Sequence, residues 1–180
     1  MSPALRLMLC TGQRVTEILG LSEGSYDRRL EMLDWGKTKN GQPHNLPLNP
    51  RAKAIMDALV PNKHGLYFPH RTDGRRPVSV NLPAATVSRY VATVEGLEPF
   101  TPRDIRRTWK TLAGAAGISK ELRDRLQNHA RSDISSKHYD RYEMMPERRA
   151  AVNVWGAYLD RILAGELDND VVQLPRAAGV

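Results

Sequence analysis

The stretch TPRDIRRTWKTLAGAAG, residues Thr101–Gly117, is the clearest structural signal in the chain. It opens with a threonine suited to cap a helix, a proline at the first helical position, and Asp104 at the capping-box position. Apolar side chains then recur at helical spacing, and Gly117 ends the pattern. They form one stripe: Ile105, Trp109, Leu112, Ala113 and Ala116. The stretch therefore predicts an amphipathic helix that packs one face against a core.

Three arginines, Arg103, Arg106 and Arg107, crowd the first turns of this helix, although the helix dipole disfavours cations there. At about 100° per residue, Arg106 falls at the edge of the apolar stripe, whereas Arg103, Arg107 and Lys110 lie further round. Arg106 is thus expected to be partly buried, which requires an anionic partner. That partner is either an internal carboxylate or a bound phosphate. Arg107 is expected to be plain solvated charge.

A second arginine stands in a similar setting in TGQRVTEILGL, residues 11–21. Arg14 follows a glycine break at a helix start, and Glu17 lies three residues further on. Two rigid guanidinium groups can hold the non-bridging oxygens of one phosphodiester and stabilise the charge that builds up at phosphorus. Glu17 either orients Arg14 or forms an ordinary ion pair on the helix surface.

The composition favours a polyanionic partner, with nucleic acid ahead of a membrane surface. The chain has 180 residues, a net charge of +7 and a pI of about 9.8. Its length suits one domain with a real core. Cys10 is the single cysteine, which excludes an internal disulfide, and it is expected to be buried in a protein of a reducing compartment. No stretch of sequence is long and apolar enough to span a bilayer.

Hydrophobic periodicity predicts a mainly helical domain with one small antiparallel sheet, an α+β fold. Strands are expected at 30–35 and 44–48, joined by a hairpin whose Asn40-Gly41 pair is a strong turn signal. Besides 101–117, helices are expected at 2–10, 14–21, 49–60, 82–94, 119–128, 133–142 and 146–165. The apolar side of the last one is predicted to hold Ala151, Val154, Trp155, Tyr158, Leu159 and Ile162.

Five segments, in this order, resemble the motifs of the tyrosine recombinases, or phage-type integrases. TGQRVTEILGL resembles the first arginine box, and KTKNGQPHNLPLN resembles the β-hairpin with the catalytic lysine. FTPRDIRRTWKTLAGAAGIS resembles the second box, LQNHA the leucine-glycine-histidine element, and SSKHYDRYE the segment with the nucleophilic tyrosine. The resemblance runs from about Leu5 to Leu163, and five motifs in order are specific although each alone is weak. It implies the catalytic-domain fold of that family.

On this resemblance the chain is a site-specific DNA recombinase that cleaves and rejoins double-stranded DNA without a metal or nucleotide cofactor. A tyrosine oxygen attacks the scissile phosphate, giving a 3′-phosphotyrosyl bond and a free 5′-hydroxyl. Tyr139 has the spacing of this nucleophile and is preferred to Tyr142, three residues further on. The resemblance implies that Arg14 and Arg106 hold the phosphate.

The resemblance also implies roles for three more residues. Lys39, at the hairpin tip, would protonate the leaving 5′-oxygen, and it is preferred to Lys37 because it directly precedes the Asn-Gly turn. His129 would hydrogen-bond the phosphate or the transition-state oxygens, although a histidine at a helix end is more often a cap or a surface residue. Arg103 departs from the pattern, because the family has histidine there and arginine cannot accept a proton at neutral pH.

The resemblance further implies an organisation and a setting. Residues 1–165 would form the catalytic domain, and 166–180 a tail that is either exchanged between protomers or folded back on its own domain. The family's N-terminal DNA-clamping domain is expected to be absent, in keeping with the abrupt start on an apolar run. Full-length members act as tetramers on DNA, whereas an isolated domain can be a monomer. The expected location is the bacterial cytoplasm, at the nucleoid.

Three other functions remain open from the sequence. Arg103 and the missing domain motivate a DNA-binding remnant that no longer cleaves. A type IB topoisomerase-like enzyme would share the chemistry but relax supercoiled DNA without site preference. A generic basic helical protein would bind RNA or acidic partners and would not depend on Arg14, Arg106 or Tyr139.

Overall fold

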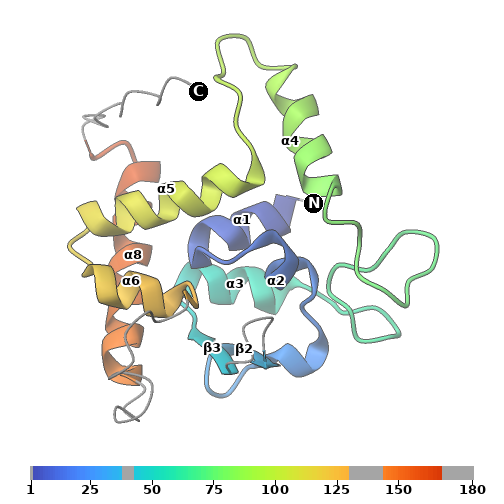
Figure 1. Ribbon diagram of the computed structural model, residues 1–180, viewed down its shortest axis with the longest axis horizontal. Helices are drawn as coiled ribbons and strands as arrows, with labels where there is room; N and C mark the ends of the chain where they lie inside the picture. The colour runs from blue at the N-terminus through green and yellow to red at the C-terminus, as the bar shows by residue number, and fades with distance from the viewer. Residues whose placement is uncertain (1, 38–42, 130–143, 168–180) are drawn as a thin grey trace.

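The computed structural model describes residues 2–37, 43–129 and 144–167. Helices dominate these residues, and a three-stranded sheet lies at one end of the molecule (Figure 1). The helices are α1 (Ser2–Thr11), α2 (Val15–Leu19), α3 (Pro50–Ala58), α4 (Leu82–Val91), α5 (Pro102–Ala115), α6 (Lys120–Leu126) and α8 (Met145–Leu163), with a 3-10 turn η1 (Glu23–Ser25). The strands are β1 (Tyr26–Asp27), β2 (Met32–Lys37) and β3 (Pro43–Pro47). The predicted α+β class is confirmed.

The sheet has the order β1-β2-β3, and its strand pairs are antiparallel. The predicted pairing of the two hairpin strands is confirmed, with Leu33 opposite Leu46 and both side chains fully buried. The register shifts between Asp34 and Lys37, so β2 is irregular just before the hairpin tip. The tip itself, with the predicted Asn-Gly turn, lies outside the described residues.

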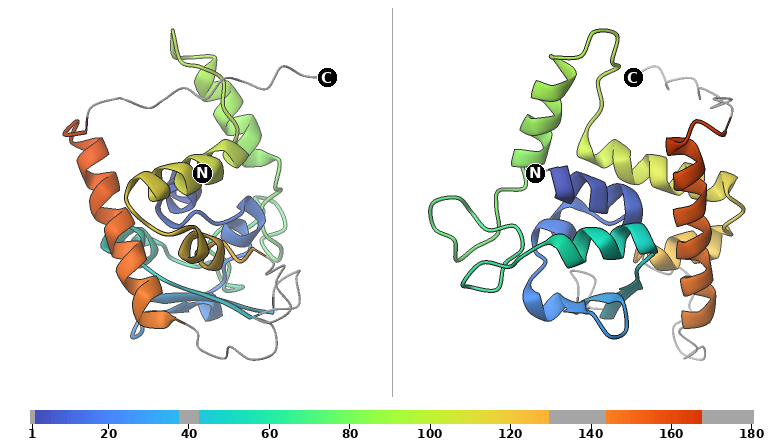
Figure 2. Two further views of the ribbon diagram at one scale, coloured as in Figure 1. Left: turned by 60° about the vertical axis from the view of Figure 1, so that its left-hand side comes forward. Right: turned by 180° about the vertical axis from the view of Figure 1, so that it is seen from behind.

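Helix α1 is the centre of the helical part, where it contacts α2, α3, α5 and α8 and lies between α5 and α3 (Figure 1). Figure 2 shows α8 running along one side of the molecule past these helices. Trp109 of α5 and Trp155 of α8 meet edge to face, with ring centroids 5.9 Å apart. Both side chains are fully buried, and Trp155 Nε1 donates to the Leu9 carbonyl of α1 at 3.1 Å. These two indoles join three helices into one core.

The break between α1 and α2 depends on Gly12. Its φ of +68° lies in the left-handed region that favours glycine. A Cβ at this position would come within 2.4 Å of Trp109 Cδ2. Glycine therefore allows the α1–α2 turn, and with it Arg14, to lie directly against α5.

Helix α5 begins as the sequence predicts, because the Thr101 backbone N and Oγ1 both donate to Asp104 Oδ2, at 2.9 and 2.7 Å.

The apolar side predicted for α8 is wrong at Val154, which is 45% exposed. The buried side of α8 includes Val152 and Gly156, and this turns Val154 toward solvent.

The remaining predicted elements agree with the structure to within a few residues, except that the helix expected at 133–142 lies outside the described residues. Helix α4 stands out from the body of the molecule and is joined to α5 by an extended segment (Figures 1 and 2).

Cys10 is buried, as predicted, and burial raises its pKa to about 11. Within the described residues, no helix has the length and apolar character needed to cross a membrane.

Candidate phosphate-binding site

Arg106 is held between the α1–α2 turn and the end of α6. Its Nη1 donates to the Gly12 carbonyl at 2.7 Å, and its Nη2 donates to the Gln127 carbonyl at 2.6 Å. Glu17 Oε2 lies 3.8 Å from Nη1, and the Arg106 side chain is 13% exposed. Burial, followed by the positive charge of Arg14, lowers the pKa of Arg106 to about 10. The predicted partial burial is confirmed, and the guanidinium stays charged at neutral pH.

Arg14 stands directly before α2 and shares Glu17 with Arg106. Glu17 Oε1 accepts a hydrogen bond from Arg14 Nη1 at 2.7 Å, and Oε2 accepts one from the Arg14 backbone N at 2.7 Å. The Glu17 side chain is 11% exposed, whereas that of Arg14 is 40% exposed. Glu17 therefore orients Arg14 and is not an ordinary surface ion pair. Two guanidinium groups and one carboxylate leave a formal local charge of +1, with Arg14 on the solvent side.

Two buried glutamines fix the surroundings of Arg106. Gln13 Nε2 donates to the Leu126 carbonyl, at the end of α6, at 2.8 Å. Gln127 Nε2 donates to the Gly12 carbonyl and to the Arg106 carbonyl, each at 3.2 Å. Neither glutamine is more than 1% exposed. Because a buried amide needs such partners, the α1–α2 turn and the end of α6 form one hydrogen-bonded unit around Arg106.

His44 of β3 extends this unit to the sheet. Its Nε2 lies 2.9 Å from Gln13 Oε1, and this oxygen can only accept, so Nε2 carries the proton. The imidazole stacks on Trp35 with ring centroids 4.9 Å apart. Burial, and then the charges of three nearby arginines, lower the pKa of His44 to about 3. The ring is therefore neutral at neutral pH.

His129 follows α6 and forms a cluster with Lys110 of α5 and Asp124 of α6. Lys110 Nζ donates to Asp124 Oδ1 at 2.6 Å. His129 Nδ1 lies 3.1 Å from the same oxygen and 3.2 Å from Lys110 Nζ. The His129 backbone N donates to the Asp124 carbonyl at 2.9 Å, so this residue also caps the helix end. Burial, and then the charges of Lys110 and Arg106, lower the pKa of His129.

Three of the six predicted site residues come together in this part of the fold. Arg14 and Arg106 share Glu17, and His129 lies two residues after Gln127, whose carbonyl binds Arg106. The His129 side chain is 36% exposed, so it is accessible beside this unit.

The other predicted residues are separate from this group or are not described. Arg103 is exposed on α5, three residues before Arg106, and forms no ion pair within the described residues. Lys39 and Tyr139 lie outside the described residues, as does Tyr142. Of Lys37, only the backbone at the end of β2 is described.

Solved structures of integrases and recombinases share this arrangement of helices and strands. The integrase from mycobacterium phage Brujita matches with a TM-score of 0.65 at 19% identity, over 85% of this chain and 51% of that one. The Tn1549 transposon integrase in complex with transposon right end DNA matches with a TM-score of 0.60 at 18% identity, over 89% of this chain and 58% of that one. XerA recombinase matches with a TM-score of 0.59 at 13% identity, over 81% of this chain and 61% of that one. The fold is that of a tyrosine recombinase catalytic domain.

This tyrosine recombinase fold accounts for most of the chain, but the chain spans only about half of the length of the phage integrase. No protein-family model matches the chain, and no curated protein matches it in sequence. The assignment of the fold therefore rests on the three-dimensional match.

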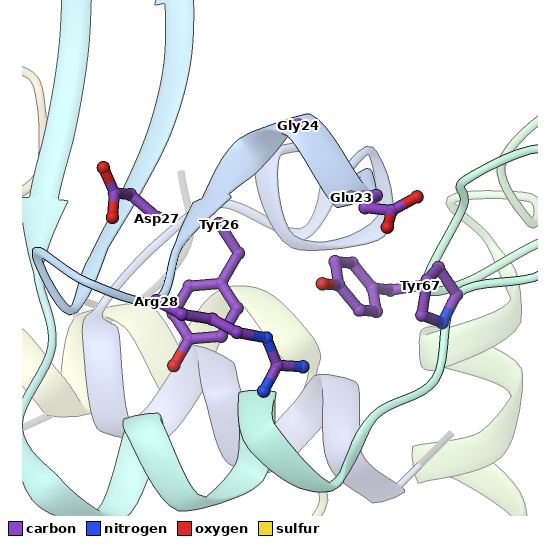
Figure 3. Close-up of a pocket in the computed structure, with 7 residues that line it drawn as sticks. Glu23, Gly24, Tyr26, Asp27, Arg28 and Tyr67 are labelled. Atoms are coloured by element: carbon purple, nitrogen blue, oxygen red, sulfur yellow. The ribbon is translucent and has the colours of Figure 1, made fainter.

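A hollow of about 520 Å³ beside η1 and β1 is separate from the arginine site (Figure 3). Tyr26, Arg28 and Tyr67 are among its lining residues, whereas Arg106 is not. Tyr26 Oη donates to Asp57 Oδ1 at 2.8 Å, and burial followed by this bond raises the pKa of Tyr26. Tyr26 is only 7% exposed and lines a hollow that neither Arg14 nor Arg106 lines, so it is not a rival to the predicted tyrosine.

Several residues of the site are not evident from the sequence. The sequence does not distinguish a buried glutamine from one on the surface. The only indication that Gln13 and Gln127 belong to the site is their position inside the arginine and histidine motifs. Lys110 was expected on the outer side of α5, and only the fold shows that it meets Asp124 and His129. The described residues contain no group of His, Cys, Asp and Glu side chains that could hold a metal ion.

Proposed function

We propose that this chain is the catalytic domain of a site-specific DNA recombinase that integrates or excises DNA by cleaving and rejoining strands. The observation that carries the proposal is the pair of arginines. Arg106 is fixed on two carbonyls, Arg14 is fixed on Glu17, and both guanidinium groups lie at the same carboxylate. Preorganised guanidinium groups are suited to stabilise the negative charge of a phosphoryl transition state.

Two further observations support double-stranded DNA as the substrate. The net charge of +7 favours a polyanion. Solved structures with the same fold include the Tn1549 integrase in complex with a circular intermediate DNA and XerH recombinase bound to its difH substrate. DNA is therefore a better candidate than RNA or an acidic protein.

In the proposed reaction the bonds are exchanged one for one. Tyr139 Oη gives up its proton to a base or to water and attacks the scissile phosphorus, the new Oη–P bond forms, and the bond from phosphorus to the 5′-oxygen breaks. Arg14 and Arg106 stabilise the charge on the non-bridging oxygens, and Lys39 gives a proton to the leaving 5′-oxygen. His129 contacts the phosphate or the transition-state oxygens. Attack by a different 5′-hydroxyl reverses the step and joins a new DNA partner.

The organisation expected from the sequence completes the proposal. Residues 1–165 act as the catalytic domain, and 166–180 act as a tail that is either exchanged between protomers or folded back on its own domain. The full-length protein works as a tetramer on DNA in the bacterial cytoplasm, at the nucleoid, and an additional DNA-clamping domain completes it.

Arg103 favours a second candidate, a domain that binds DNA but does not cleave it. An exposed guanidinium can attract a phosphate, but it cannot accept a proton at neutral pH. If the nucleophile depends on a histidine at this position, the chain would bind DNA without forming a covalent bond.

A nicked duplex that traps the covalent intermediate separates these candidates. The chain, Tyr139→Phe and Tyr142→Phe are incubated with it at low salt, and the products are run on a denaturing gel beside a binding assay. An adduct that is lost only with Tyr139→Phe supports the recombinase and its nucleophile, whereas loss with Tyr142→Phe alone reassigns the nucleophile. Binding without any adduct favours the second candidate, and Arg103→His is then the rescue variant. Absence of binding would refute both.

A further inference from the structure

The cluster of Lys110, Asp124 and His129 has a chemistry that the phosphate-binding arginines lack. We propose that Asp124 and Lys110 hold His129 as a neutral imidazole whose Nε2 accepts a proton from the attacking hydroxyl during DNA cleavage. Asp124 and Lys110 are positioning residues in this proposal, and His129 is the group that exchanges the proton. The inference rests on the proposed function.

Two contacts of His129 Nδ1 bear on which ring nitrogen carries the proton. Asp124 Oδ1 lies 2.6 Å from Lys110 Nζ and 3.1 Å from His129 Nδ1. A carboxylate oxygen only accepts, so it attracts a proton on Nδ1 and repels a bare Nδ1 lone pair. Lys110 Nζ lies 3.2 Å from Nδ1 and can only donate, so this contact favours the opposite tautomer. The proposal requires the tautomer in which Nδ1 carries the proton and donates to Asp124. Nε2 is then an open acceptor, and within the described residues it has no hydrogen-bond partner.

The charges that face His129 keep it in the neutral form that a proton acceptor requires. Burial, followed by the charges of Lys110 and Arg106 on α5, lowers the pKa of the ring, and these effects outweigh the attraction of Asp124 on α6. The ring is nevertheless 36% exposed, so a substrate can reach it. His129 is thus ready to take up a proton at neutral pH.

The other groups near the arginines are unsuited to the same task. Arg14, Arg103 and Arg106 are permanently charged donors. Glu17 has both carboxylate oxygens bound by Arg14, and it is only 11% exposed. Among the described residues around Arg106, His129 is therefore the accessible neutral base.

The proposed proton transfer is balanced. As the nucleophile's Oη–P bond forms, its Oη–H bond breaks and the proton moves to His129 Nε2, while the 5′-oxygen leaves with a proton from Lys39. The resulting imidazolium is stabilised by Asp124 and can donate to a phosphate oxygen. In the rejoining step the same proton returns to the tyrosine.

The test combines the pH dependence of single-turnover adduct formation on the nicked duplex with ¹⁵N NMR of histidine-labelled protein. His129→Gln assigns the signals of this ring among the five histidines. Lys110→Met removes a facing positive charge and should move the acid limb of the profile to higher pH. Asp124→Asn removes the facing negative charge and should move it to lower pH. On that limb, each pH unit of displacement changes the rate about tenfold.

Lys120→Met, which removes an exposed lysine elsewhere on α6, is the matched control and should leave the midpoint unchanged. Opposite displacements in the two variants, with the wild-type proton on Nδ1, are the expected result. The inference would be overturned if the neutral His129 ring of the wild type carried its proton on Nε2, or if the acid limb had the same midpoint in both variants as in the wild type. Either result would leave the proposed function unaffected. Absence of adduct from the wild-type chain at every pH would instead overturn the proposed function.

Discussion

Buried His44 should make the domain sensitive to acid. The ring is 3% exposed, stacks on Trp35 and has a pKa of about 3, whereas an unfolded chain holds histidine with a pKa near 6.5. Between these two values the unfolded chain binds more protons than the folded one, so stability falls as the pH drops. The difference between the two pKa values corresponds to about 5 kcal/mol of the free energy of unfolding. About 2 kcal/mol of it is lost between pH 7 and pH 5.

Urea denaturation at pH 7 and pH 5 measures this loss. Because His44→Gln keeps an N–H that can reach Gln13 Oε1 but does not titrate, its stability should fall by about 2 kcal/mol less than that of the wild type. With ordinary urea dependence, this difference displaces the midpoint by about 1 M. His64→Gln, at an exposed histidine, is the matched control and should retain the acid sensitivity of the wild type. Equal losses in the wild type and in His44→Gln would refute the reasoning.

Three substitutions test the packing around the arginine site by urea denaturation. Gly12→Ala places a Cβ at a positive φ and 2.4 Å from Trp109, so it should lower the free energy of unfolding by roughly 2 to 5 kcal/mol. A decrease of less than about 1 kcal/mol would contradict this close approach. Trp155→Phe removes the hydrogen bond to the Leu9 carbonyl and part of the core volume, and should cost about 1 to 3 kcal/mol, whereas no loss would contradict it. Arg106→Lys has one nitrogen for two carbonyls, so a loss of about 1 to 3 kcal/mol is expected, and an unchanged midpoint would show that the second bond is dispensable.

The parts of the fold that local chemistry determines could be predicted from the sequence. The start of α5 follows from Thr101 and Asp104, which are only three residues apart and bond to each other directly. The pairing of β2 with β3 follows from two short apolar runs on either side of a turn signal. The partial burial of Arg106 follows from its angle on the helix. Each of these depends on neighbours within one element or one hairpin.

The contacts that complete the site join distant parts of the chain, and no periodicity encodes them. Gln13 bonds the Leu126 carbonyl 113 residues away, and Gln127 bonds the Gly12 carbonyl 115 residues away. Both glutamines would be placed on the surface by composition alone, since an unpartnered amide is unfavourable in a core. Only the packing of α6 against the α1–α2 turn supplies the carbonyls that make their burial possible.

The burial of Arg106 allowed two anionic partners, an internal carboxylate or a bound phosphate, and the structure shows the first in Glu17. Both carboxylate oxygens of Glu17 accept hydrogen bonds from Arg14 at 2.7 Å. Only the longer distance of 3.8 Å, from Glu17 Oε2 to Nη1, joins this carboxylate to Arg106. The direct bonds of Arg106 go to two neutral carbonyls, which satisfy N–H groups without cancelling charge. Within the described residues, three of its five N–H groups therefore have no hydrogen-bond partner, and the side chain is 13% exposed. One carboxylate shared by two guanidinium groups leaves an uncompensated positive charge in a partly buried place, and binding of a phosphate would compensate it.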